Sequence, residues 1–386
     1  MKILILGGDG YLGWPTAMYL SQQGHDVTVV DSMVKRFWEA ELGVEPLAPI
    51  RPLPARVKRW KEKSGRDIEV RIGDIAENHR FVYTVFEDVR PDAIIHYAEQ
   101  PSAPYSMLDR EYCVATQRNN VIGTLNVMFA MKRSCPDAHL IKLGTMGEYG
   151  TPDIDIEEGW LDIEHNGRQE RVLFPKRPGS FYHLSKVHDS NNLEFACRIW
   201  DMRVTDLNQG VVYGIDTDET RLHDDLMTSF HYDAVFGTVI NRFVAQAIHG
   251  LPLTVYGKGG QTRGFLNIRD TLRCVELAAL NPAAAGEFRV FNQFTEQFSV
   301  SELAERVKSA AVACGYGGTE ITQIDNPRIE LEEHYYNAKH SALEDLGLTP
   351  NLLTDDVIRQ MIEVAELHRE RIDTDIIAPT VKWNQR

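Results

Sequence analysis

The residues best suited to chemistry are a tyrosine and a lysine four positions apart, Tyr182 and Lys186. On a helix this spacing places both side chains on one face. The lysine charge can lower the pKa of the phenol from about 10, which would make Tyr182 a base near neutral pH. Thr145 follows an apolar run, 138–143, that is predicted to be a strand, and its hydroxyl can share the proton. Together the three residues could remove the equivalent of a hydride from an alcohol, so we predict that they are catalytic.

Alternating strands and helices are predicted to position these residues. A short buried strand is expected at 2–6, a helix at 13–23 and a second strand at 27–30. Further strands are expected at 69–72, 93–96, 139–143 and 203–208. This alternation predicts an α/β fold with a Rossmann-type doubly wound parallel sheet in residues 1–212. A smaller, mixed α/β lobe that binds substrate is expected in residues 213–386, with 238–275 packed partly on the first domain.

The first expected strand leads into a glycine-rich turn suited to a dinucleotide. The glycines of its GxxGxxG pattern are Gly7, Gly10 and Gly13. They allow a tight turn, close approach of the backbone to a pyrophosphate, and close packing of the helix on the strand. Asp31, which ends the second strand, is predicted to accept hydrogen bonds from the adenosine ribose, so NAD is favoured over NADP. Asp74 is expected near the adenine amino group, and Gln100 near the nicotinamide ribose.

Residues 32–68 form an unusually long connection for an α/β unit. Its basic residues include Lys35, Arg36, Arg56, Lys58, Arg59, Lys61, Lys63 and Arg66. One interpretation is a surface insertion with a solvated basic face. The other is a flap over the cofactor, or an oligomer contact.

The composition limits the classes of partner. With 41 basic and 56 acidic residues, the net charge of −15 argues against a nucleic acid but allows a locally basic pocket for an anionic small ligand. The five cysteines show no metal-binding spacing, so no metal is expected. A strand begins at residue 2 and no apolar run approaches about 18 residues, so we expect a cytoplasmic protein with no signal peptide and no membrane span.

These features resemble the extended short-chain dehydrogenase/reductase family over essentially the whole chain. Further matching segments are 119–124, 210–214, 242–243, 253–257 and 260–270. The resemblance implies that the second lobe binds a nucleoside diphosphate sugar and that the protein is a homodimer. It also implies arginines on the diphosphate, here Arg242, Arg263 and Arg328.

The same resemblance implies further contacts with cofactor and substrate. The additional cofactor-binding residues are Tyr11, Leu12, Arg36, Ile75, Asn119, Tyr182, Lys186, Gln209 and Val212. The additional substrate-binding residues are Thr145, Met146, Gln209, Tyr256, Gln261 and Glu330.

Within the family, several segments are similar to those of members that make a sulfonated sugar from UDP-glucose and sulfite with NAD. These segments are 102–107, 142–150, 180–189, 206–214, 291–298 and 333–337. The likeness implies UDP-glucose and sulfite as substrates. Pro101 departs from it, because an arginine is expected there in the plant members. If that arginine holds sulfite or the sugar, another cation must replace it here.

The two residues after Thr145 separate this chain from the 4,6-dehydratases of the family, which carry an aspartate and a glutamate there as proton donor and acceptor. Here the positions hold Met146 and Gly147, and neither can transfer a proton. Two candidates for this role are close in sequence, His183 and Glu148. We favour His183 as the proton shuttle, because an imidazole titrates near neutral pH. Glu148 is the alternative, although it could be purely structural.

Three other functions remain open at this point. A nucleotide-sugar 4-epimerase would use the same three catalytic residues without any group for carbon 6. A 4,6-dehydratase is disfavoured by Met146 and Gly147. A non-catalytic NAD-binding regulator of the same fold would have no need for an activated phenol.

Overall fold

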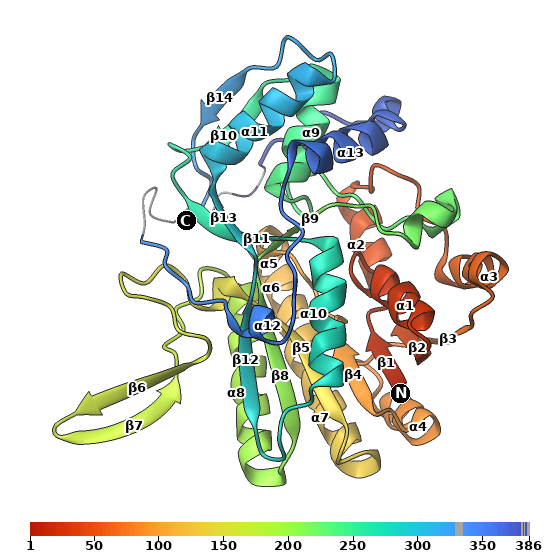
Figure 1. The fold of residues 1–386 in the computed structure, drawn as a ribbon, viewed down its shortest axis with the longest axis vertical. Coiled ribbons are helices and arrows are strands. Elements are labelled where there is room, and N and C mark those ends of the chain that lie inside the picture. Colours follow the sequence, from red (N-terminus) through yellow and green to blue (C-terminus); the bar gives the residue numbers. More distant parts are fainter. Residues whose placement is uncertain (329–334, 380, 382, 384–386) are drawn as a thin grey trace.

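The structure, a computed structural model, describes residues 1–328, 335–379, 381 and 383. In this part of the chain a seven-stranded sheet has the order β12-β8-β5-β4-β1-β2-β3, and all neighbouring strands are parallel (Figure 1). Its strands are β1 (Lys2–Leu6), β2 (Asp26–Asp31), β3 (Ile68–Ile72), β4 (Ala93–His96), β5 (His139–Thr145), β8 (Arg203–Gln209) and β12 (Phe288–Gln293). The predicted α/β fold with a doubly wound parallel sheet is confirmed.

Helices cover both faces of this sheet and bury its apolar side chains. One layer contains α1 (Gly13–Gln22), α3 (Leu53–Ser64), α10 (Ile268–Leu280) and α12 (Ala342–Asp345). The other contains α4 (His79–Val89), α7 (Gly123–Ser134) and α8 (Phe181–Trp200). The remaining helices of this domain are α2 (Val34–Leu42), α5 (Ala103–Ser106) and α6 (Arg110–Gln117). Among the described residues, we find no helix that is both long and apolar enough to span a membrane.

A second lobe lies beyond the carboxyl ends of the sheet strands (Figure 1). Its helices, α9 (Val239–His249), α11 (Val300–Ala313) and α13 (Asp355–Glu366), share one apolar core. Its strands are β9 (Val211–Tyr213), β10 (Leu253–Tyr256), β11 (Thr262–Asn267), β13 (Glu296–Ser299) and β14 (Ile321–Ile324). They form two small sheets, β13-β11-β9 and β10-β14, so this lobe is mixed α/β.

The division of the chain differs from the boundary predicted at residue 212. β12 pairs with β8 at the edge of the large sheet, and α10 packs in the same core as α1, so residues 268–293 return to the first domain. Of the segment 238–275, expected to pack partly on the first domain, α10 does so from residue 268, whereas α9 lies in the core of the second lobe. Chain order alone does not reveal this, because tertiary pairing decides which strands become neighbours.

A hairpin, β6 (Trp160–His165) with β7 (Arg168–Leu173), projects from the body of the molecule (Figure 1). It was not predicted. Most of its side chains are polar and exposed, so its sequence lacks the apolar alternation that marks a strand on a core.

Candidate functional site

Two adjoining cavities, of about 390 and 460 Å³, open at the carboxyl ends of the sheet strands. Both are lined by residues that follow β1 and β4, among them Gly7, Gly10, Tyr97 and Glu99. β1 lies between β2 and β4, so the order of the strands reverses here. In open α/β sheets this reversal is where ligands bind.

The glycine-rich turn after β1 fits a dinucleotide. A Cβ atom at Gly13 would lie 1.9 Å from the carbonyl oxygen of Gly7, so only glycine lets α1 begin so close to β1. At Gly10 a Cβ would meet only that same oxygen, at 3.5 Å, and would otherwise face open space on the wall of both cavities. This leaves room for a pyrophosphate at the start of α1. The predicted residues Tyr11 and Leu12 line the larger cavity.

The smaller cavity collects several residues predicted to bind the cofactor. Asp31 and Asp74, predicted for the adenosine half, line it together with Ile75 and Asn119. The Asp31 carboxylate already accepts hydrogen bonds from the backbone N–H groups of Asp9 (2.8 Å) and Met33 (2.7 Å). Its remaining lone pairs are available for ribose hydroxyls.

Gln100 lies behind the cavity walls rather than on them. It is fully buried, and its backbone N–H donates to the side chain of Asn120 at 2.7 Å. The preceding residue, Glu99, is the one that lines both cavities.

Part of the 32–68 insertion forms a wall of the adenosine cavity, as the flap interpretation proposed. Arg36 donates to Asp9 in the glycine-rich turn at 2.6 Å and also to the carbonyl groups of Ile50 and Arg51. Arg56 is fully buried, bonds Asp9 at 2.5 Å and lies over the ring of Trp14. A solvated face is therefore the wrong description for Arg56. Pairing with Asp9 also explains its burial, since a buried charge needs a partner.

The larger cavity brings together Thr145, Tyr182 and His183. Thr145 ends β5, while Tyr182 and His183 are in the first turn of α8, where Ser180 caps the helix by accepting from the His183 N–H. Lys186 is buried next to them; its Nζ donates to the carbonyl of Leu143 at 2.6 Å and forms an ion pair with Glu99. Four of the residues predicted to be catalytic, Thr145, Tyr182, His183 and Lys186, thus meet at one site, from β5 and α8.

Among the protein groups alone, the pKa of Tyr182 is raised, contrary to the expectation that Lys186 lowers it. The causes are burial, followed by the negative charges of Glu99 and Glu148, which outweigh the positive charge of Lys142. The ammonium of Lys186 is itself paired with Glu99, which offsets its effect on the phenol.

The imidazole of His183 occupies the space of a missing side chain. A Cβ atom at Gly147 would lie 2.3 Å from His183 Nε2 and 2.4 Å from Cδ2. Nδ1 of the same ring is 3.0 Å from Ser180 Oγ, which fixes the ring plane. Burial and the charges of Arg328 and Arg263 lower the pKa of His183 to about 3, so the ring is neutral at pH 7 and can accept a proton.

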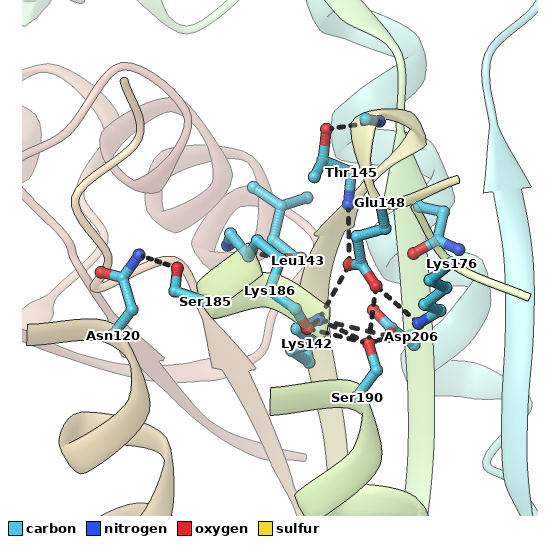
Figure 2. A network of polar contacts seen from close by, with 12 residues as sticks. Asn120, Lys142, Leu143, Thr145, Glu148, Lys176, Ser185, Lys186, Ser190 and Asp206 are labelled. Atoms are coloured by element: carbon cyan, nitrogen blue, oxygen red, sulfur yellow. Dashed lines mark hydrogen bonds and ion pairs between the residues drawn. The ribbon is translucent and has the colours of Figure 1, made fainter. Parts of the chain in front are cut away.

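Glu148 faces away from the cavity and anchors the turn that carries Thr145 (Figure 2). Its fully buried carboxylate accepts from the Thr145 N–H at 3.3 Å and pairs with Lys142 at 3.2 Å and Lys176 at 2.5 Å. Burial raises the pKa of Glu148, but the two lysines outweigh this effect and lower it to about 2. The carboxylate stays ionised and engaged, which fits a structural role.

Met146 also lies off the cavity wall. Its side chain packs in an apolar cluster with Tyr149, Phe174 and Phe294. The substrate contact predicted for it is therefore not formed by this arrangement, because the turn directs the thioether into the core.

The second lobe contributes the rest of the larger cavity. The residues predicted for the cofactor or the substrate that line it are Gln209, Val212, Arg242, Tyr256, Gln261, Arg263 and Arg328. The guanidinium of Arg242 lies over the Tyr256 ring at 4.2 Å, and burial lowers its pKa. Three arginines on one wall make a site for a diphosphate, despite the overall negative charge. Glu330 lies outside the described residues.

Two charged residues that line both cavities were not predicted as site residues. Glu99 and Lys35 each line both cavities. Glu99 has a sequence signal, because it follows a buried strand at the expected switch point. Lys35 does not, because only the folded insertion brings it to the wall, next to Glu39 and His231.

The chain matches the model of the NAD dependent epimerase/dehydratase family over residues 3–292. A relative from Spinacia oleracea, named UDP-sulfoquinovose synthase, chloroplastic, is 53% identical over 384 residues, which cover 100% of this chain and 79% of the relative. A UDP-sulfoquinovose synthase from Sulfolobus acidocaldarius is 42% identical over a match that covers 100% of this chain and 98% of the relative. A solved structure of a UDP-glucose 4-epimerase from Thermotoga maritima shares the fold, with a TM-score of 0.71 at 19% identity. The match covers 96% of this chain and 99% of the epimerase chain.

Replacing Glu148 tests its structural role. We expect Glu148→Gln to lower the free energy of unfolding by about 3 kcal/mol at neutral pH, because it leaves buried lysine charge without its partner. A carboxylate whose pKa falls from 4.5 to about 2 on folding stabilises fully above pH 4.5 and loses that effect as the pH drops toward 2. The difference between wild type and variant in urea unfolding should therefore narrow on acidification. Glu164→Gln, on the exposed hairpin, is the control, and an equal loss in both variants would contradict the assignment.

Proposed function

The chain belongs to the NAD dependent epimerase/dehydratase family, and from this premise we propose that it converts UDP-glucose and sulfite into UDP-sulfoquinovose and water. The observation that carries the proposal is the imidazole of His183 in the space that a side chain at residue 147 would occupy, beside Thr145 and Tyr182. The two relatives named UDP-sulfoquinovose synthase support the proposal, because each of them matches 100% of this chain.

The first step uses the residues at the junction of β5 and α8. NAD, when bound along the glycine-rich turn, supplies the acceptor and later the donor of the hydride at carbon 4. Tyr182 takes the proton of the carbon 4 hydroxyl, and Thr145 orients that hydroxyl. Lys186 provides positive charge beside the phenol. The resulting ketone makes the neighbouring proton on carbon 5 acidic.

The second step, loss of the carbon 5 proton and the carbon 6 hydroxyl, needs a base and an acid. Met146 and Gly147 can supply neither. His183 is neutral, and in the tautomer whose Nδ1–H donates to Ser180 Oγ its Nε2 has a free lone pair and can take the carbon 5 proton. The carbon 6 hydroxyl then leaves, and the imidazolium returns the proton to it as water. Sulfite adds through sulfur to carbon 6 of the enone, and carbon 5 takes up a proton from solvent. Carbon 4 is then reduced again, and Tyr182 returns the proton to its oxygen.

The nucleotide binds in the second lobe in this proposal. Arg242, Arg263 and Arg328 would hold the diphosphate, and the Gln261 Oε1 atom, buried without a hydrogen-bond partner, could accept from the uridine. A bound diphosphate would also oppose the charges of Arg263 and Arg328. That would raise the pKa of His183 and make it a stronger base in the complex.

We also propose that the protein is a cytoplasmic homodimer that pairs through α7 and α8. These helices expose Phe129, Phe195 and Ile199, each more than two-fifths accessible, and Phe129 contacts Trp200 between the two helices. Exposed apolar side chains on adjoining helices are suited to a second copy of the same surface. The five cysteines, all within the described residues, are unpaired, as expected in a reducing compartment.

Incubation of the protein with UDP-glucose, with and without sulfite, tests the function directly. We expect a sulfite-dependent UDP-sugar carrying a sulfonate, detected by mass, and its complete loss in Tyr182→Phe. Steady formation of UDP-galactose without sulfite would instead support a 4-epimerase and exclude the proposal.

Gly147→Ala tests the place of His183 without touching an ionisable group. The added Cβ would overlap the imidazole at 2.3 Å, so the ring must move. We expect this variant and His183→Ala to keep their NAD but to lose exchange of the carbon 5 proton with solvent by at least about a hundredfold. Gly179→Ala is the matched control, because a Cβ there meets nothing within 4 Å. Unchanged exchange in His183→Ala would remove His183 from the mechanism.

Phe195→Glu tests the dimer. A carboxylate in the middle of the apolar surface of α7 and α8 should convert the dimer into a monomer, measured by light scattering after size-exclusion chromatography. Val312→Glu, equally exposed on α11, should leave the dimer intact. A wild-type protein that is already monomeric would refute the proposed pairing.

A further inference from the structure

Glu99 occupies the position where the two cavities meet. It follows β4, its side chain is 3% exposed, and it lines both the adenosine cavity and the catalytic cavity. A carboxylate this well buried needs a positive partner. Its partner is Lys186, one of the three residues predicted to be catalytic.

The ammonium of Lys186 is held from two neighbouring strands. Its Nζ donates to the carbonyl of Leu143 on β5 at 2.6 Å, and Glu99 pairs with it from the end of β4. An ammonium has three donors, so one remains for the cavity. Lys186 Nζ lies 5.7 Å from the centre of the Tyr182 ring, and the two fixed contacts set that distance.

We propose that Glu99 is a positioning residue that fixes Lys186 beside Tyr182 and sets the pH range in which Tyr182 accepts a proton from the substrate. The inference rests on the proposed function only in that Tyr182 takes the proton of the carbon 4 hydroxyl. It needs neither sulfite nor the elimination step.

The charges around the phenol come from several elements. They are Glu99 after β4, Lys142 on β5, Glu148 in the turn 146–148, and His183, Lys186 and Asp189 on α8, with Arg263 and Arg328 near His183. His183 is neutral at pH 7, and burial followed by the charge of Glu99 raises the pKa of Asp189 well above its usual value. Glu148 is paired with Lys142 and Lys176. Glu99 is thus the carboxylate whose charge acts most strongly on Tyr182, ahead of Glu148.

Glu99→Gln removes the charge but keeps the shape. The phenolate becomes easier to form, so the acidic limb of the pH profile for oxidation of UDP-glucose should move down by about one unit or more. Because Lys186 also loses its tether, the plateau rate should fall by at least about tenfold. The KM for UDP-glucose should stay within about twofold, because Glu99 is remote from the arginines of the second lobe.

The readout is the reduction of bound cofactor by UDP-glucose in the absence of sulfite. Glu99→Asp keeps the charge, so the acidic limb of its pH profile should lie at the wild-type pH. Its plateau rate should stay below that of the wild type, because the shorter side chain holds Lys186 less well. Glu87→Gln, exposed on α4, is the control. A limb that stays at the wild-type pH in Glu99→Gln, or one that moves equally in Glu99→Asp, overturns the inference. A wild type that oxidises UDP-glucose but never forms a sulfonate refutes the proposed function alone.

Discussion

The pairing of a buried lysine, Lys142, determines how the catalytic residues are arranged. It is fully enclosed on β5, so its charge must be matched, and it pairs with Glu148 at 3.2 Å and with Asp206 on β8 at 3.3 Å. The same ammonium donates to the carbonyl of Lys186 on α8 at 3.1 Å. One charge thereby joins β5, β8, the turn after β5 and the helix that carries Tyr182 (Figure 2). Removing one partner of such a cluster costs more than most surface contacts contribute, because it leaves a buried charge unmatched.

A second constraint is steric and acts on the other side of the same turn. Glu148 binds the backbone of Thr145 from the core side, and the His183 ring lies against Gly147 from the cavity side. A side chain at residue 147 and an imidazole at residue 183 are therefore mutually exclusive in this geometry. Gly147 and His183 therefore form one structural unit, in which the absence of a side chain on the turn makes room for the ring on the helix.

The sequence predicts those parts of the molecule whose signals are local. Strand periodicity locates six strands of the large sheet, and the spacing of Tyr182 and Lys186 places them together because α8 is a regular helix. The features that the sequence does not predict depend on tertiary contacts. β12 joins the sheet only by pairing with β8, and Arg56 is buried only because α3 folds back onto Asp9. Glu148 and His183 are both close in sequence to the catalytic residues. The fold directs Glu148 into the core and His183 to the cavity wall, and the sequence alone does not show this difference.

Charge placement explains how an acidic chain can hold anionic ligands. Its positive groups at the site lie in two places, around the catalytic residues and in the second lobe. Lys142 and Lys176 are paired with Glu148 and Asp206 behind the wall, and Lys186 is paired with Glu99, which is on the wall. The arginines of the second lobe line the open space, where a diphosphate can reach them. The first set keeps the catalytic groups rigid, and the second provides the field that holds a nucleotide. Because the paired lysines belong to the first domain and the arginines to the second lobe, the groups that set the pKa of the Tyr182 phenol are separate from those suited to a nucleotide. The pKa of His183 depends on Arg263 and Arg328, so a change of charge beside these arginines would change the basicity of the imidazole.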